Sequence, residues 1–321
     1  NMGCYHPAKR FLTGHLTENG KKEGVISLSN DDTPFFPLEK AEKTVGHKIR
    51  KDKDYVIYSK GRNGLALYNY EEIPCGHCLG CRLKKAAEWA TRVAMEMRIK
   101  PYSNWFLTIT YNDENDPGTL KKRDMQLFLK KLRKKGKLRY FLAGEYGPKN
   151  ARPHYHMILL NYDIGKTQKW DRKLAKATDL EKIWGMGNIL AAPANETTAA
   201  YTTQYTIKKA YELEKDWPKG FEKPFILMSR RPGLGAEYLE MKGTDGHIYE
   251  NGTKPAPRYA KNWLEKKNPE LYEKIKEEAK KLAHKYEEQD RHMFDEERKT
   301  YIADKKEEIK KGKLKERRDK I

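Results

Sequence analysis

The feature that most constrains the fold is a pair of histidines, His154 and His156, that stand one residue apart in the segment RPHYHMILL. Successive side chains of a β-strand point to opposite faces, so this spacing places both imidazoles on one face. The context favours a strand, because Pro153 is tolerated as a first strand residue and an apolar run, residues 157–160, follows. Two converging imidazoles form half of a metal site, although a pair of hydrogen-bonded surface histidines is the simpler interpretation.

A second strand is expected over residues 140–146, joined to the histidine strand by the turn-rich residues 147–150. Antiparallel pairing of the two strands brings Glu145 close to His154 and His156. Two imidazoles and a carboxylate leave coordination positions open for water and a phosphate oxygen, and a site with an oxygen donor can hold Mg²⁺ or Mn²⁺. The sequence therefore predicts a divalent metal site, with an ordinary edge-strand charge as the alternative interpretation of the glutamate.

A helix with two tyrosines on one face is predicted from residue 195 onward. Asn195 is a suitable N-cap, and Tyr201, Tyr205 and Lys208 follow at spacings of four and three residues. Such an aromatic stripe usually packs into the core of a protein. Beside a divalent metal, however, a phenol can serve as the nucleophile for a phosphodiester, because the metal polarises the phosphoryl oxygen and helps to ionise the hydroxyl.

The chain contains four cysteines, namely Cys4, Cys75, Cys78 and Cys81. No export signal is visible, which argues against a disulfide framework. The last three form C-x-x-C-x-x-C, which can bend three thiolates around one ion, and Cys4 can complete a tetrahedral structural Zn²⁺ site. His6 and His77 are substitute ligands if one thiolate does not reach. An iron–sulfur cluster has the same cysteine spacing, and free thiols in a turn are the simplest alternative.

The charge of the chain indicates a polyanionic partner. It has 66 basic and 46 acidic side chains, a formal net charge of +20 and a pI near 9.5, which predict salt-sensitive binding to nucleic acid. A membrane surface is the rival partner. We expect no membrane association, because no apolar run approaches the roughly 20 residues needed to span a bilayer and no secretory segment is visible. The expected location is therefore the cytosol.

Two basic segments are candidates for contact with DNA phosphates. Their residues are Lys121, Lys122, Arg123, Arg230 and Arg231. The first three open a basic helix for which Thr119 is the expected N-cap, and the other two lie in the turn-rich segment SRRPGLG. An ordinary solvated helix face or surface loop would carry the same charges.

The pattern of elements predicts an α+β fold. The order strand, helix, strand, strand, helix, strand, helix in the middle of the chain is typical of an antiparallel sheet flanked by helices. We expect a β-rich module with the cysteine metal site over residues 1–81, a catalytic domain over 82–261 and a charged helical tail over 262–321. No G-x-x-x-x-G-K-[ST] motif occurs, so no helicase engine is predicted within the chain.

Six short segments occur in a characteristic order. They are CYHP at residues 4–7, PCGHCLGCR at 74–82, FLTITY at 106–111, HYH at 154–156, YTTQYTIK at 201–208 and SRRPGLG at 229–235. The third, fourth and fifth segments resemble the three ordered motifs of HUH endonucleases. All six together resemble the replication initiators of small single-stranded DNA bacteriophages, of the gokushovirus type in the Microviridae.

This resemblance implies an HUH-like catalytic fold and rolling-circle replication. Tyr201 or Tyr205 would attack the scissile phosphate, leaving a 5′-phosphotyrosyl enzyme and a free 3′-OH. The second tyrosine would cut the regenerated origin so that the strand ends are rejoined without ATP, and Lys208 would offset charge in the transition state. The implied partners are single-stranded DNA at the replication origin, a host helicase and a host DNA polymerase, in the host bacterial cytoplasm.

Two alternatives remain at this stage. The first has the same chemistry in another process, as in an HUH relaxase or transposase. The second is a non-catalytic, zinc-stabilised protein that binds single-stranded nucleic acid, in which the histidines and tyrosines pack or stack on bases. Only the first would become covalently attached to DNA.

Overall fold

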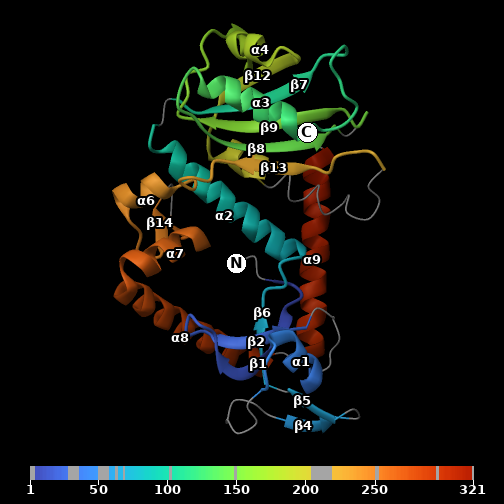
Figure 1. The fold of residues 1–321 in the computed structure, drawn as a ribbon, viewed down its shortest axis with the longest axis vertical. Coiled ribbons are helices and arrows are strands. Elements are labelled where there is room, and N and C mark those ends of the chain that lie inside the picture. The colour runs from blue at the N-terminus through green and yellow to red at the C-terminus, as the bar shows by residue number, and fades with distance from the viewer. Residues whose placement is uncertain are drawn as a thin grey trace. The chain divides into compact units, whose positions relative to one another are not determined.

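The computed structural model describes most of the chain (Figure 1): residues 4–27, 36–49, 58–61, 64–67, 69–100, 103–147, 150–203, 219–249, 253–293 and 296–319. The chain divides into two compact units. The first comprises residues 1–82 and 294–321, and the second comprises residues 83–293. The predicted domain boundaries after residues 81 and 261 stay a prediction.

The first unit is built around two small antiparallel sheets, each of three strands. One has the order β2 (Lys22–Ile26), β1 (Ala8–Leu16), β6 (Tyr70–Ile73), and the other has the order β3 (Phe36–Pro37), β5 (Gly64–Leu67), β4 (Tyr58–Gly61). Helix α1 (Leu38–Val45) closes a small core that includes Phe11, Val25 and Phe36. The unit also contains helix α9 (Glu296–Asp319) and the first turn of helix α2 (Leu79–Met97).

The second unit contains a seven-stranded sheet in which every strand pair is antiparallel. The order is β10 (Gln168–Lys169), β11 (Ala175–Lys176), β12 (Gly187–Pro193), β7 (Trp105–Tyr111), β9 (Pro153–Leu160), β8 (Arg139–Tyr146), β13 (Phe225–Met228). The prediction of an α+β fold with an antiparallel sheet flanked by helices is confirmed.

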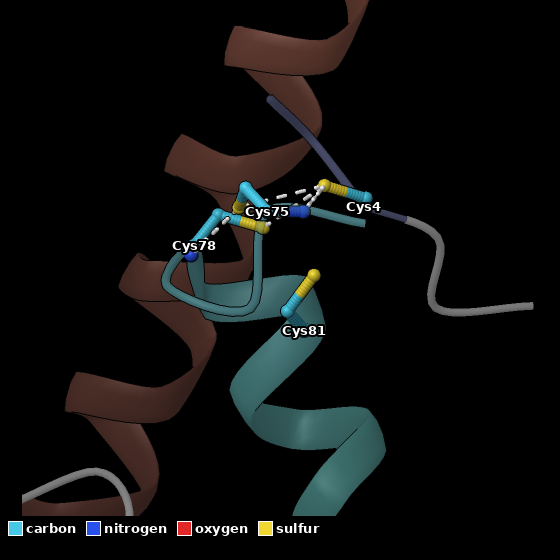
Figure 2. A group of neighbouring side chains, drawn as sticks. All are labelled: Cys4, Cys75, Cys78 and Cys81. Atoms are coloured by element: carbon cyan, nitrogen blue, oxygen red, sulfur yellow. Dashed lines mark hydrogen bonds between the residues drawn. The ribbon is translucent and has the colours of Figure 1, made fainter. Parts of the chain in front are cut away.

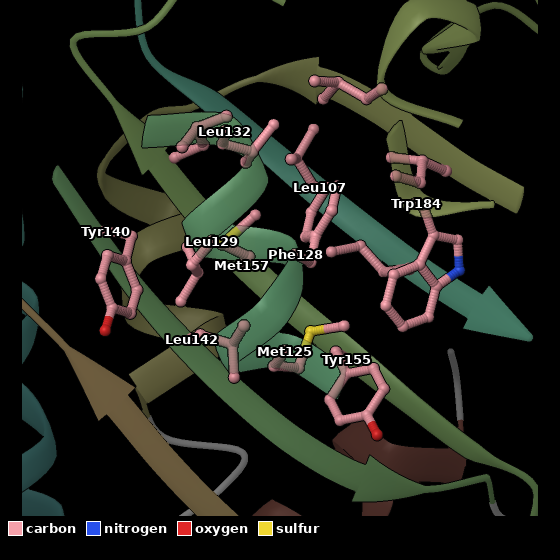
Figure 3. Close-up of a cluster of buried hydrophobic side chains, with 14 of the residues drawn as sticks. Leu107, Met125, Phe128, Leu129, Leu132, Tyr140, Leu142, Tyr155, Met157 and Trp184 are labelled. Atoms are coloured by element: carbon pink, nitrogen blue, oxygen red, sulfur yellow. The ribbon is translucent and has the colours of Figure 1, made fainter. Parts of the chain in front are cut away.

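One face of this sheet is covered by α3 (Lys122–Arg133) and α4 (Thr178–Trp184), as Figure 1 shows. Alternation along β9 directs Tyr155 and Met157 to this face, where both are fully buried. They pack with Phe128 of α3 and Trp184 of α4 in the main core (Figure 3). Burying a large apolar side chain contributes about 1.5–3 kcal/mol, so this layer holds β9 in one register.

The opposite face of the sheet is covered by residues of α2 that lie in the second unit. Val93 and Met97 pack there with Ile158 of β9 and Phe141 of β8. Because Ile158 has the same parity as the two histidines of β9, those histidines also belong to this face. The core on the α3 side thus determines which way the histidines point.

The remainder of the second unit is largely helical. It comprises α6 (Ala236–Lys242), the hairpin of β14 (His247–Tyr249) and β15 (Thr253–Pro255), α7 (Arg258–Lys267) and α8 (Pro269–Met293). In the described part of the chain, no helix combines the length and the apolar character needed to cross a membrane.

The two predicted helix starts have different outcomes. Asn195 is confirmed as an N-cap, because its side-chain oxygen accepts a hydrogen bond of 2.9 Å from the Thr198 N–H. Thr119 is not the N-cap of α3, which follows Lys121 and has no side-chain cap. The Thr119 hydroxyl instead lies 2.9 Å from the Tyr146 hydroxyl and accepts the Glu222 N–H, so tertiary partners occupy it.

Candidate metal centres and nucleophile

The predicted meeting of Glu145 with the two histidines is confirmed. In the β8–β9 ladder Glu145 lies opposite His154. The Oε1 atom of Glu145 is 2.8 Å from Nε2 of His154 and 2.9 Å from Nε2 of His156. Ligand atoms about 2.1 Å from a metal and at right angles to each other are about 3.0 Å apart, so these distances suit an octahedral site. We call these three residues the triad.

The outer nitrogens of both imidazoles have oxygen neighbours. Nδ1 of His154 is 3.2 Å from the Arg152 carbonyl, and Nδ1 of His156 is 3.2 Å from the Thr108 hydroxyl. A carbonyl can only accept, so His154 must carry its proton on Nδ1 to bond it. Its Nε2 lone pair then faces the Glu145 carboxylate, an arrangement that requires either a second proton or a cation between them.

Glu145 presents negative charge in a buried position. Its side chain is 1% exposed, and its second oxygen, Oε2, is buried with no hydrogen-bond partner among the described residues. Burial opposes ionisation, but hydrogen bonds from His154 and His156 outweigh it and hold the pKa of Glu145 below its ordinary value. A buried carboxylate oxygen without a partner is costly, and a cation would satisfy it. The residues of the triad therefore fit a divalent metal.

Tyr201 lies beside the triad. The described part of its helix covers residues 196–203. Its ring centroid is 5.6 Å from that of His156 and 6.1 Å from that of Phe106, with both pairs nearly perpendicular. Burial and, less strongly, the negative charge of Glu145 raise the pKa of Tyr201 to about 12. Its hydroxyl is therefore protonated at neutral pH, and a nearby cation would favour its ionisation.

The other two residues predicted on the tyrosine helix, Tyr205 and Lys208, lie outside the described residues. Sequence reasoning assigned no role to Phe106 and Thr108, which the structure brings to the triad. Phe106 stacks on His156 with centroids 5.4 Å apart, and Thr108 pairs with His156 across the β7–β9 ladder. The alternation of FLTITY is a signal for this placement, since it sets these two side chains on one face.

The four cysteines gather as predicted, and none of them forms a disulfide. Figure 2 shows Cys4 from the N-terminal segment meeting Cys75, Cys78 and Cys81. All four sulfur atoms lie within 4.8 Å of one another, and that of Cys4 is 3.6 Å from Cys75 and 3.8 Å from Cys78. Zn–S bonds of about 2.3 Å in a tetrahedron place sulfur atoms about 3.8 Å apart, so the cluster fits Zn²⁺. We call it the cysteine cluster.

Backbone N–H groups point at the sulfur atoms of the cluster. The Tyr5 N–H donates to Cys78 at 3.4 Å, and the Cys75 N–H donates to Cys4 at 3.3 Å. Burial raises the pKa of Cys4 and of Cys81. Burial also opposes ionisation of Cys78, but hydrogen bonds from backbone N–H groups and neighbouring thiols lower its pKa to about 6.

The two substitute ligands are not in the cluster. Nε2 of His6 is 2.8 Å from Oε2 of Glu307 in α9. Glu307 is buried and also accepts the Leu79 N–H at the start of α2, over 3.0 Å. His77 is exposed and contributes only a backbone N–H, to the Cys75 sulfur. With four sulfur atoms already gathered, neither imidazole is needed.

The predicted DNA-contacting residues separate into two groups. Lys122 lines one groove together with Arg230 and Arg231, although more than a hundred residues separate them in the sequence. Lys121 and Arg123 are not among the described residues that line it. Lys122, Arg123, Arg230 and Arg231 are exposed, and all of these residues belong to the second unit.

Comparison with known proteins identifies the relatives of the chain. A family model that describes replication-associated proteins of the ORF2 type matches residues 104–210, a stretch that contains the triad and Tyr201. The Replication-associated protein ORF2 of Spiroplasma virus 4 is 29% identical over 231 residues, which are 65% of this chain and 61% of that protein. The chain thus spans less than two thirds of that relative's length.

Two further relatives come from other phages. The Replication-associated protein VP4 of Bdellovibrio phage phiMH2K is 29% identical over 255 residues, 71% of this chain and 79% of that protein. The Replication-associated protein ORF4 of Chlamydia phage 1 is 26% identical over 153 residues, 43% of this chain and 38% of that protein. No solved structure matches the chain.

Proposed function

Because the chain belongs to the replication-associated proteins of the Microviridae phages, we propose that it starts rolling-circle replication as an HUH endonuclease. It cuts single-stranded DNA at the replication origin, in a metal-dependent and site-specific manner, and later rejoins the strand. The observation that carries this proposal is the contact of Tyr201 with His156 beside a fitted divalent-metal site. A buried phenol, two imidazoles and a carboxylate are the groups that phosphodiester transesterification requires.

Glu145, His154 and His156 would hold Mg²⁺ or Mn²⁺. When bound, the cation polarises the phosphoryl oxygen and favours ionisation of a nearby phenol. The Arg152 carbonyl and the Thr108 hydroxyl orient the two imidazoles toward it through their Nδ1 atoms. The stacked ring of Phe106 shields one side of His156 from water and keeps that imidazole in place.

The chain's own nucleophile is Tyr201 or Tyr205. Its phenolic oxygen forms a bond to phosphorus while the bond from phosphorus to the 3′-oxygen breaks, and the phenol proton ends on that oxygen. The products are a 5′-phosphotyrosyl protein and a 3′-OH that a host polymerase extends. The second tyrosine cuts the regenerated origin, and the 3′-OH released rejoins the ends. Lys208, three residues after Tyr205, offsets charge in the transition state.

The other parts of the chain support this reaction. The cysteine cluster would hold a structural Zn²⁺ in the N-terminal module, and the basic residues 121–123, 230 and 231 would contact DNA phosphates. The catalytic domain is placed at residues 82–261, followed by the charged tail. A host helicase would unwind the duplex in the host bacterial cytoplasm, since no P-loop occurs in the chain.

The test is detection of a covalent protein–DNA adduct on a denaturing gel, with Mn²⁺ and single-stranded oligonucleotides that tile the phage genome. DNA labelled at its 3′ end gives a labelled adduct, and DNA labelled at its 5′ end gives only a shorter free strand. We expect the adduct to disappear without metal, in His154→Ala and in the double variant Tyr201→Phe/Tyr205→Phe. The single variants identify the initiating tyrosine.

The matched control is Tyr301→Phe, which changes an exposed tyrosine of α9. It should form the adduct like the wild type. Binding of origin DNA without any adduct would overturn the nuclease and leave a single-stranded nucleic-acid-binding protein. Rolling-circle intermediates in infected cells separate the initiator from an HUH relaxase or transposase.

A further inference from the structure

A second basic feature lies at the β13 edge of the large sheet, away from the triad. It is a groove of about 990 Å³ formed by the end of β13, the start of β8 and α3. Its charged lining residues, all basic, are Lys122, Arg133, Lys137, Arg139, Arg230 and Arg231. No acidic residue occurs among the described residues that line it, so the groove is an electropositive channel.

Most of this charge is not neutralised by the protein. Lys122, Arg133, Lys137, Arg230 and Arg231 are exposed, and none forms an ion pair with another residue that the structure describes. Arg139 is different, because its Nε lies 2.7 Å from Oε1 of Glu96 and its side chain is 18% exposed. The five exposed cations are therefore available to a polyanion, and Arg139 has a structural task.

That task is to hold the loop that carries Arg230 and Arg231. Nη1 of Arg139 donates to the Pro232 carbonyl over 2.8 Å, and buried Glu96 accepts the Gly235 N–H over 2.7 Å. At the other end of the loop, the Ser229 N–H donates to the Tyr140 carbonyl over 3.0 Å.

A third side chain completes the support of this loop. Nε of Arg92 in α2 donates to the Leu234 carbonyl over 3.0 Å. The backbone of residues 229–235 is thus fixed at both ends while two arginine side chains stay exposed. A fixed backbone lowers the entropy lost on binding, so the loop is preorganised to present its charges.

The position of the groove relates it to the triad. Arg139 and Glu145 are both on β8, six residues apart and on the same face. At about 3.3 Å per residue, the groove begins about 20 Å from the metal ligands. At about 3.4 Å per nucleotide of one strand, this distance corresponds to roughly six nucleotides.

We infer that this groove binds the phosphate backbone of the single-stranded DNA substrate, on one side of the scissile phosphate and about six nucleotides from it. The inference rests on the proposed function, since it concerns the same DNA strand. Six cations spread over a long open channel suit several phosphates in a row rather than one small anion. The groove supplies affinity and register, and the triad supplies the chemistry.

The test compares two variants with the same change in net charge. The groove variant is Lys137→Gln/Arg230→Gln/Arg231→Gln. The control variant, Lys130→Gln/Lys134→Gln/Lys135→Gln, changes exposed lysines at the end of the same basic helix that do not line the groove. Binding is measured by fluorescence anisotropy, with oligonucleotides that extend about 4 or about 15 nucleotides on each side of the cut site.

The groove variant should bind the long oligonucleotide on the order of 10–100-fold more weakly than the wild type, and its salt dependence should be smaller by about two log units per log unit of salt, because each single-strand phosphate contact contributes about 0.7. Its affinity for the short oligonucleotide and its single-turnover cutting rate at saturating DNA should be unchanged. The control variant should show no length-dependent loss. Equal losses in both variants, or equal losses for long and short DNA, would overturn the inference.

The same binding experiment in the Tyr201→Phe/Tyr205→Phe background separates this inference from the proposed function. A length-dependent loss there supports the groove even if no adduct forms in any variant. An adduct in the wild type together with length-independent binding of the groove variant supports the nuclease and rejects the groove.

Discussion

The cysteine cluster and the triad are both groups of ligand atoms within 4.8 Å of one another, yet they suit opposite tasks. Four sulfur donors fill a tetrahedron and leave no position for a substrate, which is typical of a structural zinc site. Two nitrogens and one oxygen leave coordination positions open, which is what a reaction at phosphorus needs. Donor number and type, more than proximity, distinguish the two sites.

The two sites also differ in what holds them together. The triad lies on β8 and β9, and β9 has a hydrogen-bonded strand on each side in the large sheet. The cysteine cluster joins Cys4 to a turn that begins 71 residues later, through thiol contacts of 3.6 and 3.8 Å. We therefore expect metal loss to leave the fold of the second unit intact and to loosen the first unit. The predictions below test this difference.

The largest effect is expected from the double variant Cys78→Ser/Cys81→Ser. Structural zinc sites of this kind contribute about 10 kcal/mol or more of apparent binding free energy, so the first unit should unfold without the ion. Metal analysis should find one tightly bound zinc per wild-type chain and none in the variant, and limited proteolysis should release a core within residues 83–293. A variant that resists proteolysis like the wild type would show that the cluster is not a structural site.

His154→Ala should leave the fold in place and remove the activity. Loss of a single preorganised charge-stabilising group costs about 10²–10³-fold in rate, and loss of the metal should cost at least as much. Adduct formation should fall to background while the melting temperature changes little. The control is His247→Ala, which changes an exposed histidine of the same unit outside the triad. Unfolding of His154→Ala would place the triad with the structural sites.

Zinc affinity of the cysteine cluster should fall steeply as the pH falls. Cys4 and Cys81 have raised pKa values, so both are protonated at neutral pH and must lose a proton to bind zinc. Two protons released per ion correspond to about a hundredfold change in affinity per pH unit. Below the Cys78 pKa of about 6 a third proton is released, and the slope increases further. Competition with a chromogenic chelator between about pH 5.5 and about pH 8 measures the slope, and a flat profile would contradict these protonation states.

The smallest effect is expected from Thr108→Val, which removes the oxygen next to Nδ1 of His156 without changing the side-chain shape. Loss of such an orienting group costs about 10–100-fold in metal affinity. Adduct formation should therefore need more Mn²⁺ but reach the wild-type rate at saturation. Thr110→Val is the matched control, because Thr110 lies on the same strand and its hydroxyl donates to the Asn188 carbonyl instead. An unchanged Mn²⁺ requirement would exclude an orienting role for Thr108.

The local part of the site was predictable because it depends on short-range periodicity. The period of two in HYH, the turn at residues 147–150 and the position of Glu145 together specify one hairpin register, and that register is the observed one. Asn195 was predictable as an N-cap for the same reason, since a cap bonds only within its own first turn. Thr119 was predicted wrongly, because its hydroxyl bonds to Tyr146, a residue from another strand.

The sequence by itself determined the antiparallel α+β class, the hairpin that carries the triad and the four cysteines able to share one ion. Only the tertiary structure decided which distant side chains meet. It brought Lys122 and Arg231 to one groove, set Glu307 of α9 against Leu79 and placed Phe106 on His156. Periodicity and spacing act over a few residues, whereas these contacts depend on how whole layers pack, and no local pattern in the chain encodes that packing.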